Sequence, residues 1–330
     1  MTSARSRRSR HTAALLGALA GIVGLALAAS GCAAVVSTPV AGVDAPVVVA
    51  AGTAAVSMIM VDGIERTYRL QVPARADTDA PLPLVLVLHG AGGSAERAEI
   101  ATGMSALADA NGFIVAYPQG TQAAEIPGEY SWNAGVCCGA PVATGIDDVG
   151  FITTLIADVS TAHPVDAERI FVAGFSNGGM LANRLACEVG GIVAGIAVVG
   201  GALNVERCEA PTTTSVLLVH GTADATVPYA GGATNERTAA RFGSWINASV
   251  QDAVDYWAGR DDCLPEPVST IEGAVTTATW QECAADAALT LVTIAEGGHV
   301  WPIAEVSGFD ASSLIVEHFG LGAGEVALAR

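Results

Sequence analysis

Short apolar runs alternate with longer stretches of helical character along most of the chain. Residues 84–88 (Leu-Val-Leu-Val-Leu) and 169–173 (Arg-Ile-Phe-Val-Ala) are rich in aliphatic side chains, which is typical of strands buried in the middle of a parallel sheet. Further strands are expected at 57–61, 66–72, 113–117, 192–199, 216–219 and 289–294, and helices at 95–110, 148–162, 179–187, 249–259 and 311–319. This alternation predicts an α/β fold in which helices cover both faces of a mostly parallel central sheet.

Two segments interrupt the alternation. Asp62-Gly63, between the first two apolar runs, is typical of a tight β-hairpin turn. Residues 118–146 show neither a helical nor a strand period, so we expect a long irregular loop there.

The N-terminal 31 residues have the pattern of an export signal. Four arginines precede an uncharged stretch rich in Ala, Leu and Gly at 12–29, and small residues then lead to Cys32. The pattern resembles a bacterial lipobox, in which Cys32 would be lipidated and become the new N-terminus. Ordinary cleavage near the same alanines, which would leave Cys32 as a spare thiol, is an alternative, as is a short transmembrane helix.

The chain is therefore expected to have three parts. Residues 1–31 are a signal peptide of the lipoprotein type, and residues 32–56, rich in Ala, Val, Gly and Pro, are a flexible tether. Residues 57–330 are long enough for one large globular domain. We expect this domain outside the cytoplasm, either anchored to the membrane through lipid on Cys32 or free in the extracellular space.

The charge balance changes once the signal is set aside. All 15 basic residues are arginines and four of them lie in the signal, so 11 arginines face 33 acidic residues, a formal charge of −22. Such a chain offers no basic patch for nucleic acid, and it repels anionic polymers. A neutral ligand or substrate fits this composition best.

Six cysteines follow Cys32, and an even number in an exported chain predicts disulfide bonds. Cys263 and Cys283 flank a Thr/Val-rich segment that could be a hairpin, so this pair is favoured. The other four are Cys137, Cys138, Cys187 and Cys208. Cys137 and Cys138 could bond to each other, or each could reach Cys187 or Cys208. A bond to Cys187 would fasten the long loop to the helix at 179–187. No C-x-x-C motif occurs and no histidine lies at ligand spacing, which excludes a zinc site at these thiols.

Gly174-Phe-Ser-Asn-Gly178 lies between an expected strand and an expected helix. A strand, then G-x-S-x-G, then a helix is the nucleophile elbow of the α/β-hydrolases, whose sharp turn lifts the serine above the carboxyl end of the sheet. Ser176 is thus the candidate nucleophile, and the backbone N–H of Asn177 is a candidate donor to an oxyanion. In a chain with 38 glycines, a structural Gly-rich turn is the alternative.

A serine hydroxyl needs a base to take its proton and an acid to orient that base. Asp224 lies four residues beyond the apolar run that ends at His220, and His299 lies on a Gly-Gly loop after the run at 289–294. This is the order Ser, Asp, His of the hydrolase fold. Other acids (Asp252, Asp255, Asp261 and Asp262) and other histidines (His220 and His318) fit these positions less well, because they lie on helices, before a cysteine or at a strand end.

The segment His89-Gly-Ala-Gly-Gly-Ser94 follows the apolar strand at 84–88. The hydrolase fold places its second oxyanion donor there, and we expect the donor to be the backbone N–H of Ala91. A phosphate-binding loop is a weak alternative, because neither G-x-x-x-x-G-K-[ST] nor G-x-G-x-x-G occurs there.

Several motifs in one order resemble the secreted esterase family that includes polyhydroxybutyrate depolymerases and feruloyl esterases. They occupy residues 83–94, 117–121, 131–139, 147–151, 174–180, 220–224 and 297–302. The resemblance implies a carboxylic-ester hydrolase that uses Ser176, Asp224 and His299, needs no cofactor, and acts on neutral hydroxyalkanoate, feruloyl or acetyl esters. Some members of this family are bacterial lipoproteins, in agreement with Cys32.

Three motif residues, Trp132, Asn133 and Trp301, are expected near the mouth of such a site. They could contact an aromatic acyl group or a sugar, or they could pack under the long loop. Asp147-Asp148 is expected to cap the helix that follows it. An acyltransferase or a peptidase with the same three residues, and a non-catalytic surface-binding lipoprotein, are the competing hypotheses.

Overall fold

The computed structural model describes residues 54–322 apart from 75–79, 124–126, 206–207 and 209–211. The expected signal peptide, most of the expected tether and Cys32 lie outside the described residues. The strand β1 covers Ala54–Val61, so residues 54–56, expected in the tether, belong to it. No helix among the described residues has the length and apolar character that crossing a bilayer requires.

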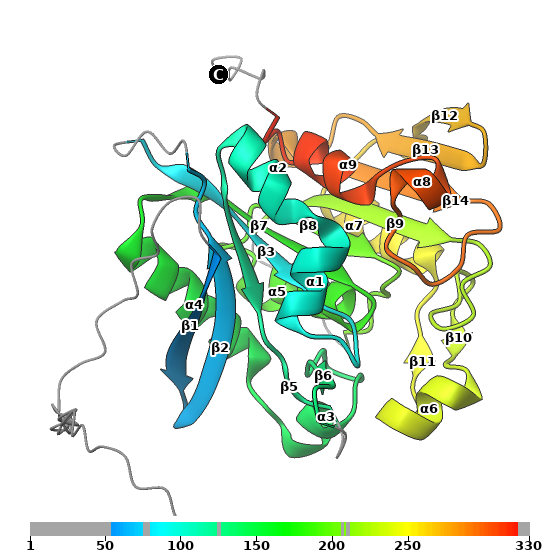
Figure 1. The fold of residues 1–330 in the computed structure, drawn as a ribbon. Helices are drawn as coiled ribbons and strands as arrows, with labels where there is room; N and C mark the ends of the chain where they lie inside the picture. The colour runs from blue at the N-terminus through cyan, green and yellow to red at the C-terminus, as the bar shows by residue number, and fades with distance from the viewer. Residues whose placement is uncertain (1–53, 75–79, 124–126, 206–207, 209–211, 323–330) are drawn as a thin grey trace, which may run out of the picture. The chain divides into compact units, whose positions relative to one another are not determined.

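Ten strands of the described part form one sheet. They are β1 (Ala54–Val61), β2 (Ile64–Gln71), β3 (Leu82–Leu88), β4 (Ile114–Pro118), β7 (Val165–Phe175), β8 (Gly195–Val199), β9 (Ser215–Gly221), β12 (Val268–Glu272), β13 (Val275–Trp280) and β14 (Leu289–Ile294). Their order in the sheet is β1-β2-β4-β3-β7-β8-β9-β14-β13-β12 (Figure 1). The central strands from β4 to β14 run parallel, and antiparallel hairpins close both edges.

Short elements complete the described part. The helices are α1 (Ala95–Thr102), α2 (Met104–Asn111), α3 (Ala140–Thr144), α4 (Asp148–Ala162), α5 (Asn177–Val189), α6 (Glu236–Phe242), α7 (Val250–Arg260), α8 (Ala304–Ser307) and α9 (Ala311–His318), with a 3₁₀ turn at Ala284–Asp286. Two small ladders join β5 (Thr121–Gln122) to β6 (Tyr130–Ser131) and β10 (Gly232–Ala233) to β11 (Ile246–Asn247). The expected α/β class with a mostly parallel sheet is confirmed.

The side chains of each central strand alternate between two helical layers, because successive residues of a strand point to opposite faces. Leu84, Leu86 and Leu88 of β3 belong to the core under α4, α5 and α7. Val85 and Val87 belong to the core under α1, α2 and α9. Both faces are thus buried, which explains why the sequence of this strand is continuously apolar.

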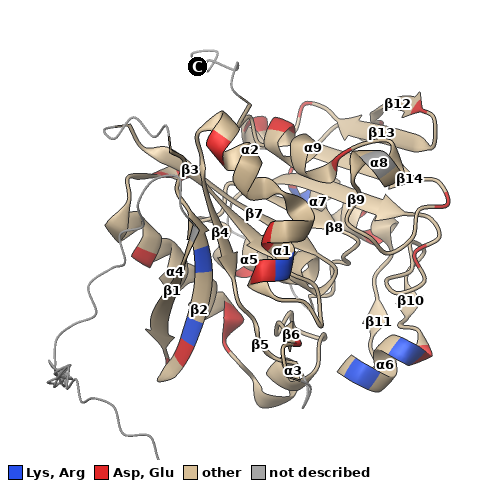
Figure 2. Cartoon of the chain, in the orientation of Figure 1, with Lys and Arg blue, Asp and Glu red and all other residues tan. Residues whose placement is uncertain are grey.

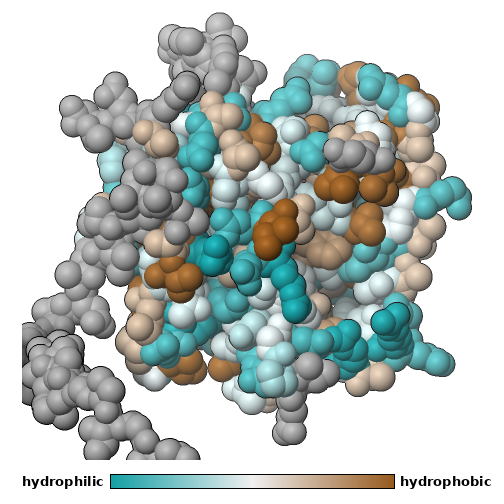
Figure 3. All heavy atoms as spheres, in the orientation of Figure 1, coloured by the Kyte–Doolittle hydropathy of each residue, from teal (hydrophilic) through white to brown (hydrophobic). Residues whose placement is uncertain are grey.

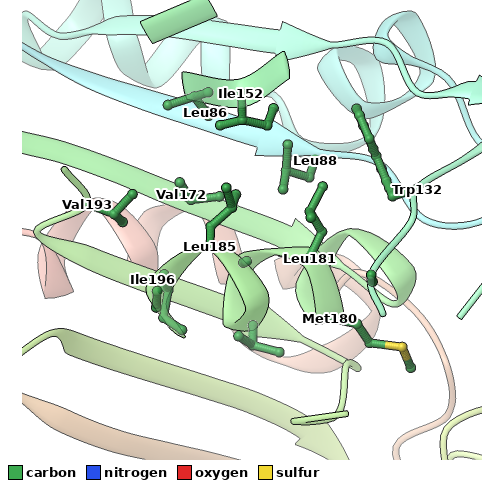
Figure 4. Close-up of a cluster of buried hydrophobic side chains, with 14 of the residues drawn as sticks. Leu86, Leu88, Trp132, Ile152, Val172, Met180, Leu181, Leu185, Val193 and Ile196 are labelled. Atoms are coloured by element: carbon green, nitrogen blue, oxygen red, sulfur yellow. The ribbon is translucent and has the colours of Figure 1, made fainter. Parts of the chain in front are cut away.

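Figure 4 shows part of the first of these cores. Side chains of the sheet meet those of α4 and α5, and the labelled residues include Leu86, Leu88, Ile152, Val172, Leu181, Leu185 and Ile196. Truncating one such leucine to alanine typically costs about 2–5 kcal/mol of stability. This packing makes the sheet a rigid support for the loops at its carboxyl edge.

One expected helix is two. The segment expected as a single helix at 95–110 is divided at Gly103, which adopts a left-handed φ of 60° and separates α1 from α2. Glycine adopts this conformation without steric strain, so it ends helices readily. The segment 118–146, expected to be irregular, contains α3 and the small ladder of β5 with β6.

Three disulfide bonds join the six cysteines of the described part. Cys263 pairs with Cys283 across the β12–β13 hairpin, as expected. Cys137 pairs with Cys138, and Cys187 pairs with Cys208. The hypothesis of a bond from Cys137 or Cys138 to Cys187 is therefore wrong: the long loop is held to the elbow helix by hydrogen bonds instead.

Charged side chains are unevenly distributed. On the face drawn in Figure 2, basic residues appear on β2, α1 and α6, each with acidic residues close by along the chain. Two of the arginines are paired with acids from distant elements, Arg69 with Glu99 and Arg241 with Glu129. The positive charges on this face are therefore partly neutralised.

Candidate active site

Ser176 is the single residue that connects the end of β7 to the start of α5. It adopts φ 54° and ψ −119°, a conformation that costs a non-glycine residue roughly 1–3 kcal/mol. Its backbone N–H donates to Val199 O at 2.8 Å, and only 8% of the residue is exposed. A Cβ at Gly178 would lie 2.6 Å from the carbonyl oxygen of His89, so this turn requires glycine to pack against β3.

The side chains of Ser176, His299 and Asp224 lie within hydrogen-bonding distance in a chain of contacts. His299 Nε2 is 3.0 Å from Ser176 Oγ, and His299 Nδ1 is 2.7 Å from Asp224 Oδ2. The three residues come from loops after β7, β14 and β9, which all end at the carboxyl edge of the sheet. The imidazole can accept the hydroxyl proton at one nitrogen while the other nitrogen donates to the carboxylate.

The carboxylate of Asp224 is almost completely buried, with a side-chain exposure of 1%. Its Oδ1 accepts hydrogen bonds from the N–H groups of Thr226 and Val227, both at 2.8 Å. Burial alone would raise the pKa of Asp224, but hydrogen bonds from His220 and His299 outweigh burial, and the pKa lies well below its ordinary value. Asp224 is therefore held as a carboxylate that can orient the imidazole.

Close backbone packing brings the Asp224 and His299 loops together. β9 and β14 are parallel neighbours, and Ala223 N–H donates to Gly297 O at 2.9 Å. Gly200, with φ 58°, lies beneath both side chains: a Cβ there would be 3.4 Å from His299 Nδ1. The phenyl ring of Phe175 lies beside the imidazole, with ring centroids 4.8 Å apart.

The loop after β3 lies against the nucleophile. A Cβ at Gly90 would be 3.2 Å from Ser176 Cβ. Gly92 N–H donates to Tyr130 O and Gly93 N–H donates to Gly90 O, whereas the N–H of Ala91 has no acceptor among the described residues. As the first residue of α5, Asn177 has an N–H with no acceptor within the helix. Both N–H groups are available to an anionic oxygen.

His89 fixes the conformation of this loop, a role that the sequence analysis did not assign. Gly120 N–H donates to His89 Nε2 at 3.1 Å, so the proton is on Nδ1, which donates to Gly90 O at 2.9 Å. Burial, with the nearby positive charges of Arg66 and Arg97, lowers the pKa of His89 to about 4. The ring is therefore neutral at pH 7. Its position directly before the Gly-rich segment is the sequence signal for this role.

Trp132 is completely buried. Its exposure is 0%, and its Nε1–H donates to His89 O at 2.8 Å. Its backbone N–H and carbonyl are both bound by the side-chain amide of Asn177. Of the two alternatives for this residue, substrate contact and packing, its burial agrees with packing, because the indole lies beneath the loop after β3.

Asn133 is also engaged in structure. Its N–H donates to Asp148 Oδ2 at 2.7 Å, and its side-chain Nδ2 donates to Ile146 O. The other carboxylate oxygen of Asp148 accepts from Arg66 at 2.7 Å in a buried ion pair. Only Asp147 caps α4 with its side chain, which accepts from Gly150 N–H, so the expectation that both acids cap this helix is half right.

Two hollows adjoin these elements. One, of about 440 Å³, lies among Asn133, Val136, Arg184 and Asn204, where the polar side chains are already hydrogen-bonded to the protein. The other, of about 140 Å³, is lined by apolar atoms and includes Trp301 in its wall. Within the described residues, no group of three or more His, Cys, Asp or Glu side chains is placed to hold a metal ion.

Comparison with known proteins identifies relatives of the whole fold. Among solved structures, the acetyl xylan esterase from Aspergillus awamori superposes with a TM-score of 0.57 at 15% identity, over 81% of this chain and 100% of that one. At this identity the likeness shows a shared fold.

Sequence comparison identifies the family. The chain is 33% identical over 272 residues to NocK, an esterase by name, of Nocardia uniformis subsp. tsuyamanensis, over 77% of this chain and 76% of NocK. It is 28% identical over 239 residues to feruloyl esterase B of Piromyces equi, over 71% of this chain, and it spans 42% of that protein. Residues 66–228 match the family model described as esterase PHB depolymerase. The chain therefore belongs to the PHB depolymerase family of esterases.

Proposed function

We propose that this esterase hydrolyses neutral carboxylic esters of the hydroxyalkanoate, feruloyl or acetyl type through an acyl-enzyme formed on Ser176. The observation that carries the proposal is the pair of distances that link His299 to Ser176 and to Asp224, 3.0 and 2.7 Å. The negative charge of the chain supports a neutral substrate, because an anionic one would be repelled.

In the first half of the reaction, Ser176 Oγ attacks the ester carbonyl carbon while His299 Nε2 takes the hydroxyl proton. The carbonyl oxygen becomes an oxyanion held by the N–H groups of Ala91 and Asn177, each worth about 3–4 kcal/mol of transition-state stabilisation. The bond from carbon to the alcohol oxygen then breaks, and the alcohol leaves with the proton from His299. Asp224 stabilises the imidazolium during this transfer.

In the second half, water attacks the acyl carbon and gives its proton to His299. The bond to Ser176 Oγ breaks, the proton returns to Oγ, and the free acid leaves. Supplying a simple alcohol as acceptor and analysing the products separates hydrolysis from acyl transfer, since an acyltransferase would form mainly the new ester.

The test is Ser176→Ala, compared with Ser269→Ala on the exposed edge strand β12. We expect Ser176→Ala to lower turnover of p-nitrophenyl acetate at least 1,000-fold and to abolish labelling by a fluorophosphonate, because removing the nucleophile of a triad typically costs about a millionfold in kcat. The control should keep full activity, and circular dichroism should show both variants folded. Unchanged turnover in folded Ser176→Ala would refute the assignment.

We further propose that the chain is exported and anchored to the membrane through lipid on Cys32. The basic and apolar N-terminal pattern supports export, and the three disulfides of the described part fit an oxidising compartment. Cys32→Ser should move the protein from the membrane fraction to the soluble fraction and remove labelling by radioactive palmitate. A wild-type chain that carries no label would exclude the anchor.

A further inference from the structure

A small apolar pocket lies beside the nucleophile, between the end of β3, α1 and the segment after His299. Its volume is about 140 Å³, and Gly90, Ala98, Ala101, Phe175 and Trp301 are among its lining residues. α1 packs against β3, and Figure 1 shows it in front of the central strands of the sheet.

The walls of this pocket are in contact with the candidate catalytic residues. Gly90 is so close to the nucleophile that a Cβ there would lie 3.2 Å from Ser176 Cβ and 3.0 Å from the ring of Phe175. Phe175 precedes Ser176 and lies against the imidazole of His299, and Trp301 follows His299 by two residues. An acyl group bonded to Ser176 Oγ therefore begins next to the part of the pocket wall that Gly90 and Phe175 form.

The far wall is fixed by hydrogen bonds. Trp301 Nε1–H donates to Ser312 Oγ at 3.1 Å, and Ser312 in turn donates to Thr102 O at 2.6 Å. These two bonds join the indole to α9 and, through Ser312, to α1, so the ring cannot swing away to admit a longer group without breaking its bond to Ser312. Thr102 also lines the pocket, so the hydrogen-bonded residues Trp301 and Thr102 together limit its depth.

The size and polarity of the pocket restrict what can enter. An apolar cavity of about 150 Å³ holds a guest the size of benzene. A butyryl group is within that limit, whereas a feruloyl group adds a propenoyl arm, a methoxy and a phenol to its ring. The phenol would also lose its hydrogen bonds among apolar atoms, a desolvation loss of about 1–3 kcal/mol.

We propose that this pocket is the acyl-binding site and that it selects short aliphatic acyl groups of about two to four carbons over feruloyl and long-chain acyl groups. The proposal rests on the hydrolysis proposed above and narrows its substrate class. Val300, which precedes Trp301 of the pocket wall, is 50% exposed, and Figure 3 shows hydrophobic surface around α8. An aliphatic ester would gain by burial against such a surface.

The test is kcat/KM on p-nitrophenyl acetate, butyrate and octanoate and on methyl ferulate, for wild type, Ala101→Phe, Trp301→Ala and Ile100→Phe. We expect wild type to prefer butyrate to octanoate and to ferulate at least tenfold. Ala101→Phe fills the pocket and should lower the butyrate-to-acetate ratio at least fivefold. Trp301→Ala deepens it and should raise the octanoate-to-butyrate ratio at least fivefold.

Ile100→Phe is the matched control, because Ile100 is on the same helix and outside the pocket lining. Ala101 is exposed, so its substitution tests the pocket even if Trp301→Ala fails to fold. Turnover that depends on Ser176 but shows acyl ratios unchanged within twofold by Ala101→Phe would overturn the pocket alone, as would equal turnover of ferulate and butyrate by wild type. Absence of Ser176-dependent turnover of every ester would overturn the proposed hydrolysis, and this inference with it.

Discussion

The side-chain amide of Asn177 binds both backbone polar groups of Trp132, a residue 45 positions earlier in the chain. Asn177 Oδ1 accepts from Trp132 N–H at 2.8 Å, and Nδ2 donates to Trp132 O at 3.2 Å. Nδ2 also donates to Cys137 O at 3.3 Å. The side chain of Asn177 thus holds the loop around Trp132, which packs beneath the loop after β3. The backbone N–H of the same residue is the candidate oxyanion donor.

Asn177→Ala should therefore damage the site through the loop. The substitution leaves the backbone N–H of residue 177 in place but removes the acceptor of the buried Trp132 N–H, and an unsatisfied group of this kind costs about 1–3 kcal/mol. The carbonyl of Trp132 keeps a second donor, Cys138 N–H, at 3.0 Å. We expect lower stability in urea and a fall in kcat for p-nitrophenyl acetate of at least tenfold. Asn111→Ala, at the end of α2, is the control. Retention of full stability and activity would mean that the loop does not depend on this amide.

The pH dependence of stability should report the buried neutral His89. Its pKa of about 4 in the folded state lies below the ordinary value of about 6.5, so between these values the unfolded chain binds more protons. The contribution of neutral His89 to the free energy of unfolding is complete above pH 6.5 and is lost as the pH falls to 4. The loss amounts to roughly 2–3 kcal/mol. His318, whose pKa burial also lowers to about 4, should add a similar loss.

Unfolding in urea between pH 4 and pH 7 measures this dependence. His89→Gln, which retains a donor and an acceptor, should make the loss of stability between pH 6.5 and 4 clearly smaller. His318→Gln should remove a comparable share. A wild-type profile that stays flat over this range would show that neither ring is held neutral.

Because the turn at Ser176 packs closely against β3, Gly178→Ala should lower both stability and activity strongly. The added methyl group would lie 2.6 Å from the carbonyl oxygen of His89, and backbone on both sides prevents relaxation. We expect a loss of about 1–3 kcal/mol or more and a large loss of esterase activity, since the overlap pushes the oxyanion loop away from Ser176. Gly259→Ala is the control: no atom would contact its Cβ, so this helical position should gain stability.

The buried ion pair of Arg66 with Asp148 should respond differently to single and double substitution. Arg66→Met leaves the carboxylate of Asp148 buried without its partner and should cost about 3–5 kcal/mol. Arg66→Met combined with Asp148→Asn removes the unpaired charge and retains an acceptor for Asn133 N–H, so much of the stability should return. Equal losses in the single and double variants, measured by urea unfolding, would show that charge burial is not the cause.

The sequence pattern was sufficient to predict a structural element wherever neighbouring residues in the chain determine that element. The uninterrupted apolar run of β14 and the helix α4, which begins after the capping residue Asp147, have the bounds expected from the sequence. The strand-turn-helix signature around Ser176 likewise predicted a tight turn that only glycine neighbours permit. Candidates such as Asp224 and His299 could be selected because the carboxyl ends of parallel strands meet at one edge of a sheet.

Contacts between distant residues were decided by the tertiary structure. Arg66 and Asp148 are 82 positions apart, and neither position shows a period or a motif that links them. The burial of Trp132 beneath the oxyanion loop and the pairing of Cys187 with Cys208 also depend on how separate elements pack. The sequence by itself determined the central strands, most of the helices that cover them, and the candidate chemistry. Only the packing of side chains from far along the chain decided which polar groups are buried, paired and held beside Ser176, because hydrogen bonds and desolvation act over a few ångströms of space, whatever the distance along the chain.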